Sequence, residues 1–381
     1  MDMQNFINTY GCMTFSQKNF CEIDNVIFSQ LVYIDFDGIV GNSAGLPLSV
    51  VCDKYFQLHP QEEIDALIGI SQKAVALMLQ CSTAVRYKDV IVSEYVNNIN
   101  DAIDKQFAAV NFVLDQQENI VVAFRGTDVT VTGVKESAML SYMFPVPAQI
   151  QALHYFQETA MTYKGDVRIC GHSKGGNLAV FAGVSCSNSL KKRIVGVYQN
   201  DAPGFPKHFY DRYDYQQIKD KIFSFTPQSS IIGRLLGQDI QPIIVASKNS
   251  GIKQHQVSSW NIVDDHFEYV DSYESSSDFI CEYINNLIDY IGEDDLEMFF
   301  QVAEHIITIL GVEDFYDLKS TNLKKRLTSI DTLNEIDQSQ KDFMKSILRK
   351  IISDYTKIFV GEKARNFIDK HKKPQEENLN G

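Results

Sequence analysis

Short apolar runs alternate with longer segments of helical spacing through the middle of the chain. Between residues 89 and 125 the apolar positions are closely spaced and rich in Val, Ile, Phe and Tyr, with polar clusters between the runs. From residue 148 onward strand and helix patterns take turns. We therefore expect strands at 89–96, 106–114, 119–125, 166–170, 194–199, 221–226 and 241–246, and helices at 148–163 and 174–187. This alternation predicts an α/β protein with a mainly parallel sheet covered on both faces.

Helical spacing dominates outside this region. It extends over residues 61–81, and it returns after the strand signals stop near residue 275. The later helical segments are expected at 277–294, 295–311 and 334–361. The predicted parts are an α/β core at 1–275, a helical C-terminal extension at 276–368 and a polar tail at 369–381.

Composition and charge narrow the class of protein. The 381 residues are 44% hydrophobic and 22% charged, as expected for a soluble chain that buries a sizeable core. The formal net charge of −14 disfavours nucleic acid as a partner, because phosphate binding needs basic patches. It also disfavours docking on an anionic membrane by bulk charge, although a local apolar patch could contact lipid transiently.

The sequence indicates a cytoplasmic protein. Its first residues lack a secretory signal, and no run of about 18 apolar residues predicts a membrane span. The seven cysteines are scattered and form no Cys-x-x-Cys pair, which favours reduced thiols over a disulfide framework or a zinc site. No cofactor or metal is expected, and the oligomeric state is not indicated.

A candidate nucleophile follows the strand expected at 166–170. Residues 171–175 read Gly-His-Ser-Lys-Gly and match G-x-S-x-G between an apolar strand and a helical segment. Glycines are needed there because a serine on a sharp turn requires close approach of strand and helix. The pattern predicts Ser173 as the nucleophile of an α/β-hydrolase, against the alternative of a structural glycine turn.

The same architecture predicts where oxyanion donors lie. Phe-Arg-Gly-Thr at 124–127 ends the strand expected at 119–125. Thr127 can offer its backbone N–H and its hydroxyl, and the N–H of Lys174 at the helix start is the other candidate donor. The alternative is that residues 124–127 form an ordinary turn with no role in an oxyanion hole.

A serine hydroxyl needs a base, and in this fold the base follows the nucleophile in the chain. His255 lies in a loop after the last expected core strand, so we predict it as the base. His266 is its nearest competitor. The other histidines after Ser173 are His208, His305 and His371. His172 is expected to pack inside the turn.

These landmarks together resemble a family of bacterial lipase-like α/β-hydrolases of unassigned substrate, the Mbeg-like group, a distant relative of the class 3 lipases. The resemblance covers roughly residues 15–270. The matching segments lie at 24–31, 124–128, 147–149, 171–179, 200–205, 227–233 and 254–260. It implies an esterase or lipase-type fold with a serine nucleophile, a threonine at the oxyanion hole and a late histidine.

The chain departs from that pattern in three places. Residues 133–137 read Gly-Val-Lys-Glu-Ser where the family usually has Gly-Trp-Lys-Glu-Asp, and Ala202 replaces a glycine. Class 3 lipases carry an aspartate after the strand that here ends at Thr226, but residues 227–230 offer no carboxylate. The sequence therefore does not decide which residue is the third member of a triad, the one that orients the histidine. The candidates are Asp201, a polar residue of 228–230, and Asp239 or another acid.

The expected reaction is acyl transfer on a carboxylic ester, a lipid ester being one candidate on family analogy alone. Residues 129–147 form either a lid or a packing loop. One rival is a pseudo-hydrolase that binds a partner. Another is a magnesium-dependent phosphatase with Asp35 and Asp37 after an apolar strand at 31–34, although Ile39 departs from that motif.

Overall fold

The computed structural model describes residues 1–41, 45–127, 131–292, 295–298, 300, 338, 339, 342, 346 and 347. Met1–Leu296 form one compact unit and Glu297–Gly381 a second. Most of the helices expected at 295–311 and 334–361, and the whole tail at 369–381, lie outside the described residues. No helix in the described ranges combines the length and apolar character that a membrane crossing requires.

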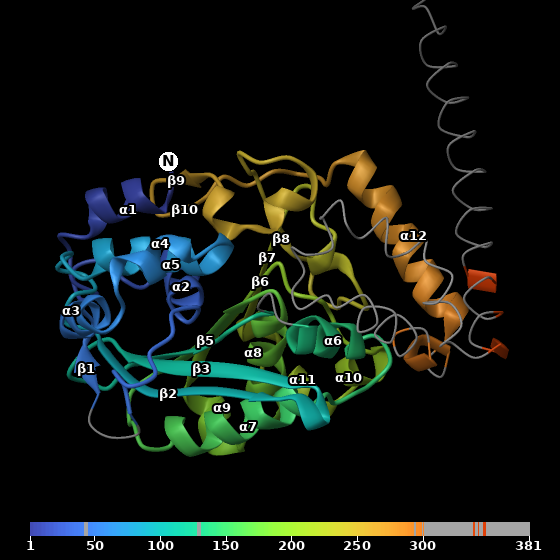
Figure 1. The fold of residues 1–381 in the computed structure, drawn as a ribbon, viewed down its shortest axis with the longest axis horizontal. Helices are drawn as coiled ribbons and strands as arrows, with labels where there is room; N and C mark the ends of the chain where they lie inside the picture. The colour runs from blue at the N-terminus through green and yellow to red at the C-terminus, as the bar shows by residue number, and fades with distance from the viewer. Residues whose placement is uncertain are drawn as a thin grey trace, which may run out of the picture. The chain divides into compact units, whose positions relative to one another are not determined.

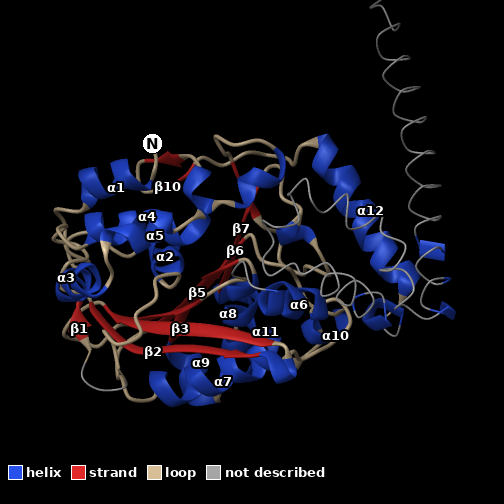
Figure 2. Cartoon of the chain, in the orientation of Figure 1, coloured by secondary structure: helices blue, strands red, loops and turns tan. Residues whose placement is uncertain are grey.

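An eight-stranded sheet forms the centre of the first unit, with its strands side by side in chain order (Figure 2). The first four strands pair antiparallel, and β4 to β8 pair parallel. The strands are β1 (Leu46–Pro47), β2 (Ile91–Asn100), β3 (Lys105–Val113), β4 (Ile120–Phe124), β5 (Val167–His172), β6 (Ile194–Asn200), β7 (Ile222–Pro227) and β8 (Ile243–Val245), with β9 (Ile262–Val263) and β10 (His266–Phe267) in a separate pair.

Both faces of the sheet are buried. Successive residues of a strand point to opposite faces, so the core clusters that they join show what covers each face. In β4, Val121 and Ala123 join one core cluster, whereas Ile120, Val122 and Phe124 join another. Helices α1 to α5 cover the first face, and α7 and α8 cover the second (Figure 1). The expected α/β class with a mainly parallel sheet is confirmed.

The helices follow the sequence pattern in most places. They are α1 (Met3–Tyr10), α2 (Glu22–Leu31), α3 (Leu48–Leu58), α4 (Gln61–Ala66), α5 (Gly69–Cys81), α6 (Val131–Met139), α7 (Pro147–Ala160), α8 (Lys174–Ser185), α9 (Asn188–Arg193), α10 (Lys207–Tyr210), α11 (Tyr213–Gln216) and α12 (Ser275–Ile291). Helix α7 shows the local reason for its start: Pro147 occupies the first turn, and the Gln149 side chain accepts the backbone N–H of Val146 at 2.9 Å.

Three local expectations differ from the structure. The single helix at 61–81 is two helices, because the backbone of Leu67 and Ile68 is extended. The irregular segment at 128–147 contains α6. The strand expected before Asp35 does not exist: helix α2 ends at Leu31 and a turn follows.

Candidate active site

The candidate nucleophile lies on a sharp turn between β5 and α8. Ser173 has φ 57° and ψ −132°, a backbone conformation that residues other than glycine rarely adopt. Its backbone N–H donates to Asn200 O at 2.9 Å, which ties the turn to the end of β6. A Cβ at Gly171 would lie 2.2 Å from the backbone of Gly175, and one at Gly175 would lie 2.2 Å from Phe124 O. These approaches explain both glycines of the motif.

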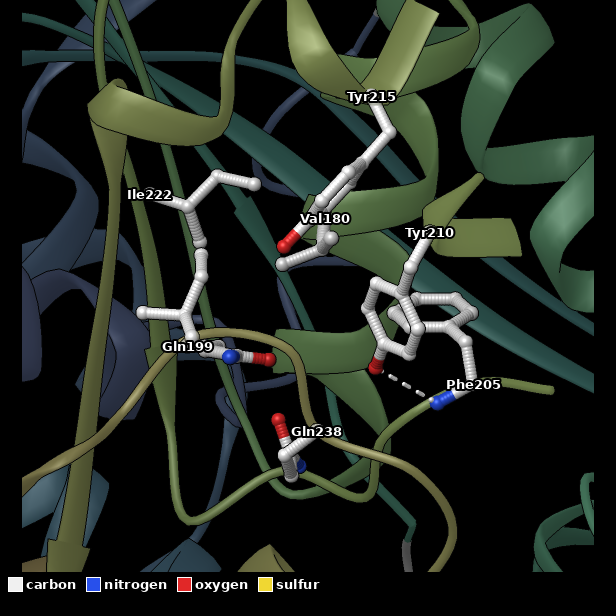
Figure 3. Close-up of a pocket in the computed structure, with 8 residues that line it drawn as sticks. Val180, Gln199, Phe205, Tyr210, Tyr215, Ile222 and Gln238 are labelled. Carbon is white, nitrogen blue, oxygen red and sulfur yellow. Dashed lines mark hydrogen bonds between the residues drawn. The ribbon is translucent and has the colours of Figure 1, made fainter. Parts of the chain in front are cut away.

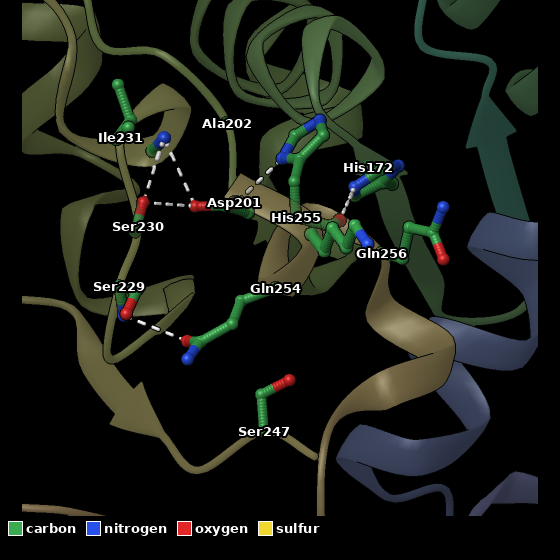
Figure 4. Close-up of polar contacts among 12 residues, drawn as sticks. His172, Asp201, Ala202, Ser229, Ser230, Ile231, Ser247, Gln254, His255 and Gln256 are labelled. Carbon is green, nitrogen blue, oxygen red and sulfur yellow. Dashed lines mark hydrogen bonds and ion pairs between the residues drawn. The ribbon is translucent and has the colours of Figure 1, made fainter. Parts of the chain in front are cut away.

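His255, which lies 82 positions after Ser173 in the sequence, packs beside the same turn. It ends a short 3-10 helix (Gly251–His255), and its Nδ1 lies 2.7 Å from Asp201 Oδ2 (Figure 4). The His255 and His172 rings are 4.5 Å apart between centroids, and His172 directly precedes Ser173. The His255 side chain is 26% exposed and the Asp201 side chain 1%. A histidine with Nδ1 on a carboxylate has Nε2 left for a proton from a serine.

The loop that carries His255 is held by its neighbours. The buried Gln254 side chain accepts the backbone N–H of Ser229 at 2.9 Å. The indole N–H of Trp260 donates to Gln254 O at 2.8 Å. The Gln-His-x-x-x-Ser-Trp segment therefore has a physical basis: its glutamine and tryptophan fix the backbone on either side of the histidine.

The other oxygen of Asp201 has its own donors. The Ser230 hydroxyl donates to Asp201 Oδ1, and Gly233 N donates to the same atom at 3.1 Å (Figure 4). A Cβ at Gly233 would lie 2.3 Å from Asp201 Oδ1, so only glycine fits there. Of the candidates for a third residue, Asp201 contacts the histidine and Ser230 contacts Asp201. Asp239 instead pairs with Lys219 at 2.6 Å.

His172 packs inside the turn, as expected. Its Nε2 donates to His255 O at 2.8 Å, so its Nδ1 is the acceptor for the Tyr33 hydroxyl at 3.3 Å. Full burial, with the neighbouring His255 as a smaller cause, holds the pKa of His172 well below its usual 6.5. A neutral His172 thus fixes the backbone of His255.

The two candidate oxyanion residues lie on either side of the turn. Thr127 follows β4, and its hydroxyl bonds to the Ser137 hydroxyl on α6. Lys174 is the first residue of α8, where backbone N–H groups lack intrahelical acceptors. A Cβ at Gly126 would lie 2.4 Å from His172 O, so the end of β4 packs directly against the turn.

The rival residues are placed elsewhere. His266 Nδ1 lies 2.7 Å from Phe267 O, and the His208 ring packs 5.3 Å from the Phe144 ring. His305 and His371 lie outside the described residues. Asp35 and Asp37 are exposed on a turn, and the part of the chain that the structure describes contains no cluster of three or more His, Cys, Asp or Glu side chains suited to a metal ion. The strand that the phosphatase interpretation requires is absent there.

The segment considered as a lid is partly packed. Met139, Leu140 and Val146 are buried together in a small apolar cluster, while Met143 is 39% exposed. Residues 128–130 of this segment are outside the described part of the chain. Burial of both ends of the 139–146 stretch agrees with the packing-loop alternative. Opening of the segment as a lid stays a hypothesis.

Two cavities lie near the loops that follow β6 and β7. One, of about 10 Å³, lies among Val180, Phe205 and Tyr215 and holds no more than a water molecule (Figure 3). The other is an open groove of about 920 Å³ lined by apolar residues such as Leu140 and Ile288 and by charged ones such as Lys207 and Asp289. None of Ser173, His255 and Asp201 lines this groove.

Comparison with known proteins identifies the family. A sequence model of the Mbeg1-like family matches residues 81–303, more than half of the chain. Lip2 lipase from Yarrowia lipolytica is 12% identical with a TM-score of 0.32, and the match covers 41% of this chain and 65%, less than two thirds, of that lipase. A lipase from Rhizopus microsporus var. chinensis is 18% identical with a TM-score of 0.33, covering 57% of this chain and 76% of that one. No curated protein matches.

The parallel sheet and the strand–serine–helix turn are those of the α/β-hydrolase fold. Within that class, the chain belongs to the Mbeg1-like family.

Some residues of the site carried no sequence signal. Glu136 was noted only as part of a segment that departs from the family pattern, and it is fully buried beside Lys174. Asn25 on α2 exchanges two side-chain hydrogen bonds with Asn200, at 2.9 and 3.0 Å, directly before Asp201. Asn25 lies in the segment 24–31 that matches the family, and that match was the available hint for it.

Proposed function

We propose that this chain is a serine hydrolase that cleaves a carboxylic ester by acyl transfer. Ser173 is the nucleophile, His255 the general base and acid, and Asp201 the residue that orients and stabilises the protonated histidine. The observation that carries the proposal is the contact between His255 Nδ1 and Asp201, with the His255 ring 4.5 Å from that of His172, the residue before Ser173. These are the roles that a Ser-His-Asp triad needs, whatever the order of strands that supply them.

The reaction proceeds in two halves. Ser173 Oγ attacks the ester carbonyl while its proton passes to His255 Nε2. The C–O bond to the alcohol breaks, and the alcohol leaves with that proton. Water then attacks the acyl-serine, gives a proton to His255, and the carboxylic acid leaves as the proton returns to Ser173 Oγ. Asp201 stays ionised throughout.

Developing negative charge on the carbonyl oxygen needs fixed donors. We assign this role to the backbone N–H groups of Thr127 and Lys174, on the two segments that meet at the turn. The Thr127 hydroxyl is already bonded to Ser137. Removal of one such donor typically slows the chemical step by about 10²–10³-fold.

A lipid ester is the substrate class that we favour among carboxylic esters. The support is membership of a lipase-like fold class together with the apolar residues of the 139–146 stretch, of which Met143 is exposed. The acyl length and the alcohol are left to experiment. The pseudo-hydrolase alternative was drawn from the missing acid after β7, and the contact of Asp201 with His255 supports the hydrolase over it.

The test is covalent labelling of the purified full chain with a fluorophosphonate. We expect wild-type protein to be labelled at Ser173 and to hydrolyse a p-nitrophenyl ester, and Ser173→Ala to lose both properties. Ser229→Ala, which changes a serine near the site but outside the proposed triad, serves as the matched control. Equal hydrolysis by wild type and Ser173→Ala would overturn the proposal.

A further inference from the structure

A lysine directly after the nucleophile has its charged end buried. The Lys174 side chain is 1% exposed, and Nζ donates to Gln106 O and Gln106 Oε1 at 2.8 Å each. A third bond goes to Glu136 Oε2 at 2.7 Å. These three acceptors match the three N–H donors of an ammonium group. The proposed acyl transfer makes no use of this charge.

The side chain of Lys174 does not serve as the base. All three contacts are with acceptors, so the amine is protonated and has no lone pair to take a proton from Ser173. Its contacts also lead away from the turn, to β3 and α6. The cation therefore has a different role.

The partner carboxylate links three elements. Glu136 on α6 is fully buried, and its Oε2 also accepts Gln106 N of β3 at 3.0 Å. Its Oε1 accepts Ala148 N, in the first turn of α7, at 2.8 Å. One side chain thus attaches α6 to β3, to α7 and, through Lys174, to the first residue of α8.

The next residue of α6 contacts the other side of the oxyanion site. Ser137 Oγ donates to Gly133 O at 2.9 Å, so its single proton is in use. The bond between Ser137 and Thr127 therefore has Thr127 as the donor. The Thr127 hydroxyl proton points to α6, which leaves the backbone N–H of Thr127 to bind an oxyanion.

We infer that Glu136 is a positioning residue for the oxyanion hole: with Ser137, it fixes the distance between Thr127 and Lys174, the two residues whose backbone N–H groups are the proposed donors. The inference rests on the proposed function. Helix α6 acts as a brace between the end of β4 and the start of α8. Loss of the brace affects the transition state, where negative charge develops on the oxygen, more than it affects substrate binding.

The experiment compares Glu136→Gln, Lys174→Met and the double variant in the full chain. Glu136→Gln leaves a buried cation without its counter-charge and lowers Tm. We expect kcat on a p-nitrophenyl ester to fall about 10- to 100-fold with KM nearly unchanged, less than the loss on removing a donor outright. Binding of a trifluoromethyl ketone, whose adduct with the serine carries an oxyanion, should weaken by the same factor.

The double variant separates positioning from stability. Removing both charges should restore most of the Tm, because no unpaired charge is left, while kcat stays low. Asp24→Asn is the matched control: Asp24 pairs with Arg86 at 2.6 Å, both side chains are fully buried, and neither belongs to the site. We expect Asp24→Asn to lower Tm with kcat per labelled site within about twofold of wild type.

Two outcomes overturn the inference. One is a double variant that regains wild-type kcat with its Tm, and the other is a folded Glu136→Gln with wild-type kcat and ketone affinity. In both, Ser173 still reacts with fluorophosphonate, so the proposed hydrolase function stands. If wild-type Ser173 does not react, the proposed function fails and the inference fails with it.

Discussion

Two regions flank Ser173, and they hold their groups by different means. We name Asp201, Ser230, Gly233 and His255 the histidine side, and Thr127, Glu136, Ser137 and Lys174 the oxyanion side. The histidine side brings together loops after β6, β7 and β8, and its single buried carboxylate is surrounded by neutral donors and a histidine. The oxyanion side uses a buried ion pair between α6 and α8.

The difference follows from what each side must do. In the proposed reaction a proton moves on the histidine side, so its carboxylate needs to remain an acceptor for His255 with no competing cation. No proton moves on the oxyanion side, and a permanent ion pair there fixes backbone donors without entering the chemistry. Damage to the two sides should therefore have different kinetic consequences.

The largest effect is expected for Asp201→Asn. The amide oxygen can still accept from Ser230 and Gly233, which turns its NH₂ group toward His255 Nδ1. The histidine must then carry its proton on Nε2, where it cannot accept one from Ser173, so kcat/KM should fall by about 10⁴-fold with the fold intact. Ester hydrolysis and circular dichroism check this.

Asp239→Asn is the control, since Asp239 pairs with Lys219 and not with the histidine. Its activity should match wild type. A loss of less than about tenfold in Asp201→Asn would show that another group orients His255.

A smaller effect is expected for Gly233→Ala. The new Cβ would lie 2.3 Å from Asp201 Oδ1, so the carboxylate must move away from its place beside His255. We expect kcat to fall about 10²-fold and the free energy of unfolding to fall by about 1–3 kcal/mol. Steady-state kinetics and urea unfolding measure the two losses.

Gly41→Ala provides the matched substitution, because no heavy atom of the described residues lies within 4 Å of a Cβ at this position. It should leave kcat unchanged. If Gly233→Ala is also fully active, the donors on Asp201 Oδ1 do not determine the geometry of the histidine side.

The smallest effect concerns stability and pH at His172. Its folded-state pKa is well below the unfolded value of 6.5, so below pH 6.5 the unfolded state binds the extra proton. The contribution of neutral His172 to the free energy of unfolding is fully present above pH 6.5. It is lost as the pH falls toward the folded-state pKa, by up to about 1.4 kcal/mol per pH unit.

His172→Asn cannot take up that proton. Urea unfolding at several pH values should therefore give a shallower acid-side slope for His172→Asn than for wild type. Identical slopes would mean that His172 is protonated in the folded protein, which conflicts with the bond from the Tyr33 hydroxyl to its Nδ1.

Sequence patterns were sufficient for the parallel half of the sheet, because β4 to β8 are short apolar runs separated by helices or turns. They failed for α2, in which nine of ten residues are buried. Four of these nine, Asp24, Asn25, Ser29 and Gln30, are polar, so the buried positions of this helix cannot be read from hydrophobicity alone. The same limit produced the false strand before Asp35.

The site divides in a similar way. The setting of Ser173 was readable because strand, glycines and helix are contiguous in the sequence. The partner of His255 was not, because Asp201 and His255 are 54 positions apart and meet only when the ends of β6 and β8 come together. Asp201 was one of three kinds of candidate, and the contact at 2.7 Å separates it from the others. Its catalytic role stays a prediction.

Asp201 shares an unusual backbone conformation with the candidate nucleophile: its φ is 47°, and that of Ser173 is 57°. Such conformations persist only where the surroundings enforce them. We therefore expect both residues to return to ordinary backbone angles when the packing around the sheet edge loosens, before the sheet itself is lost. Ester hydrolysis should therefore be lost at a lower denaturant concentration than the secondary structure.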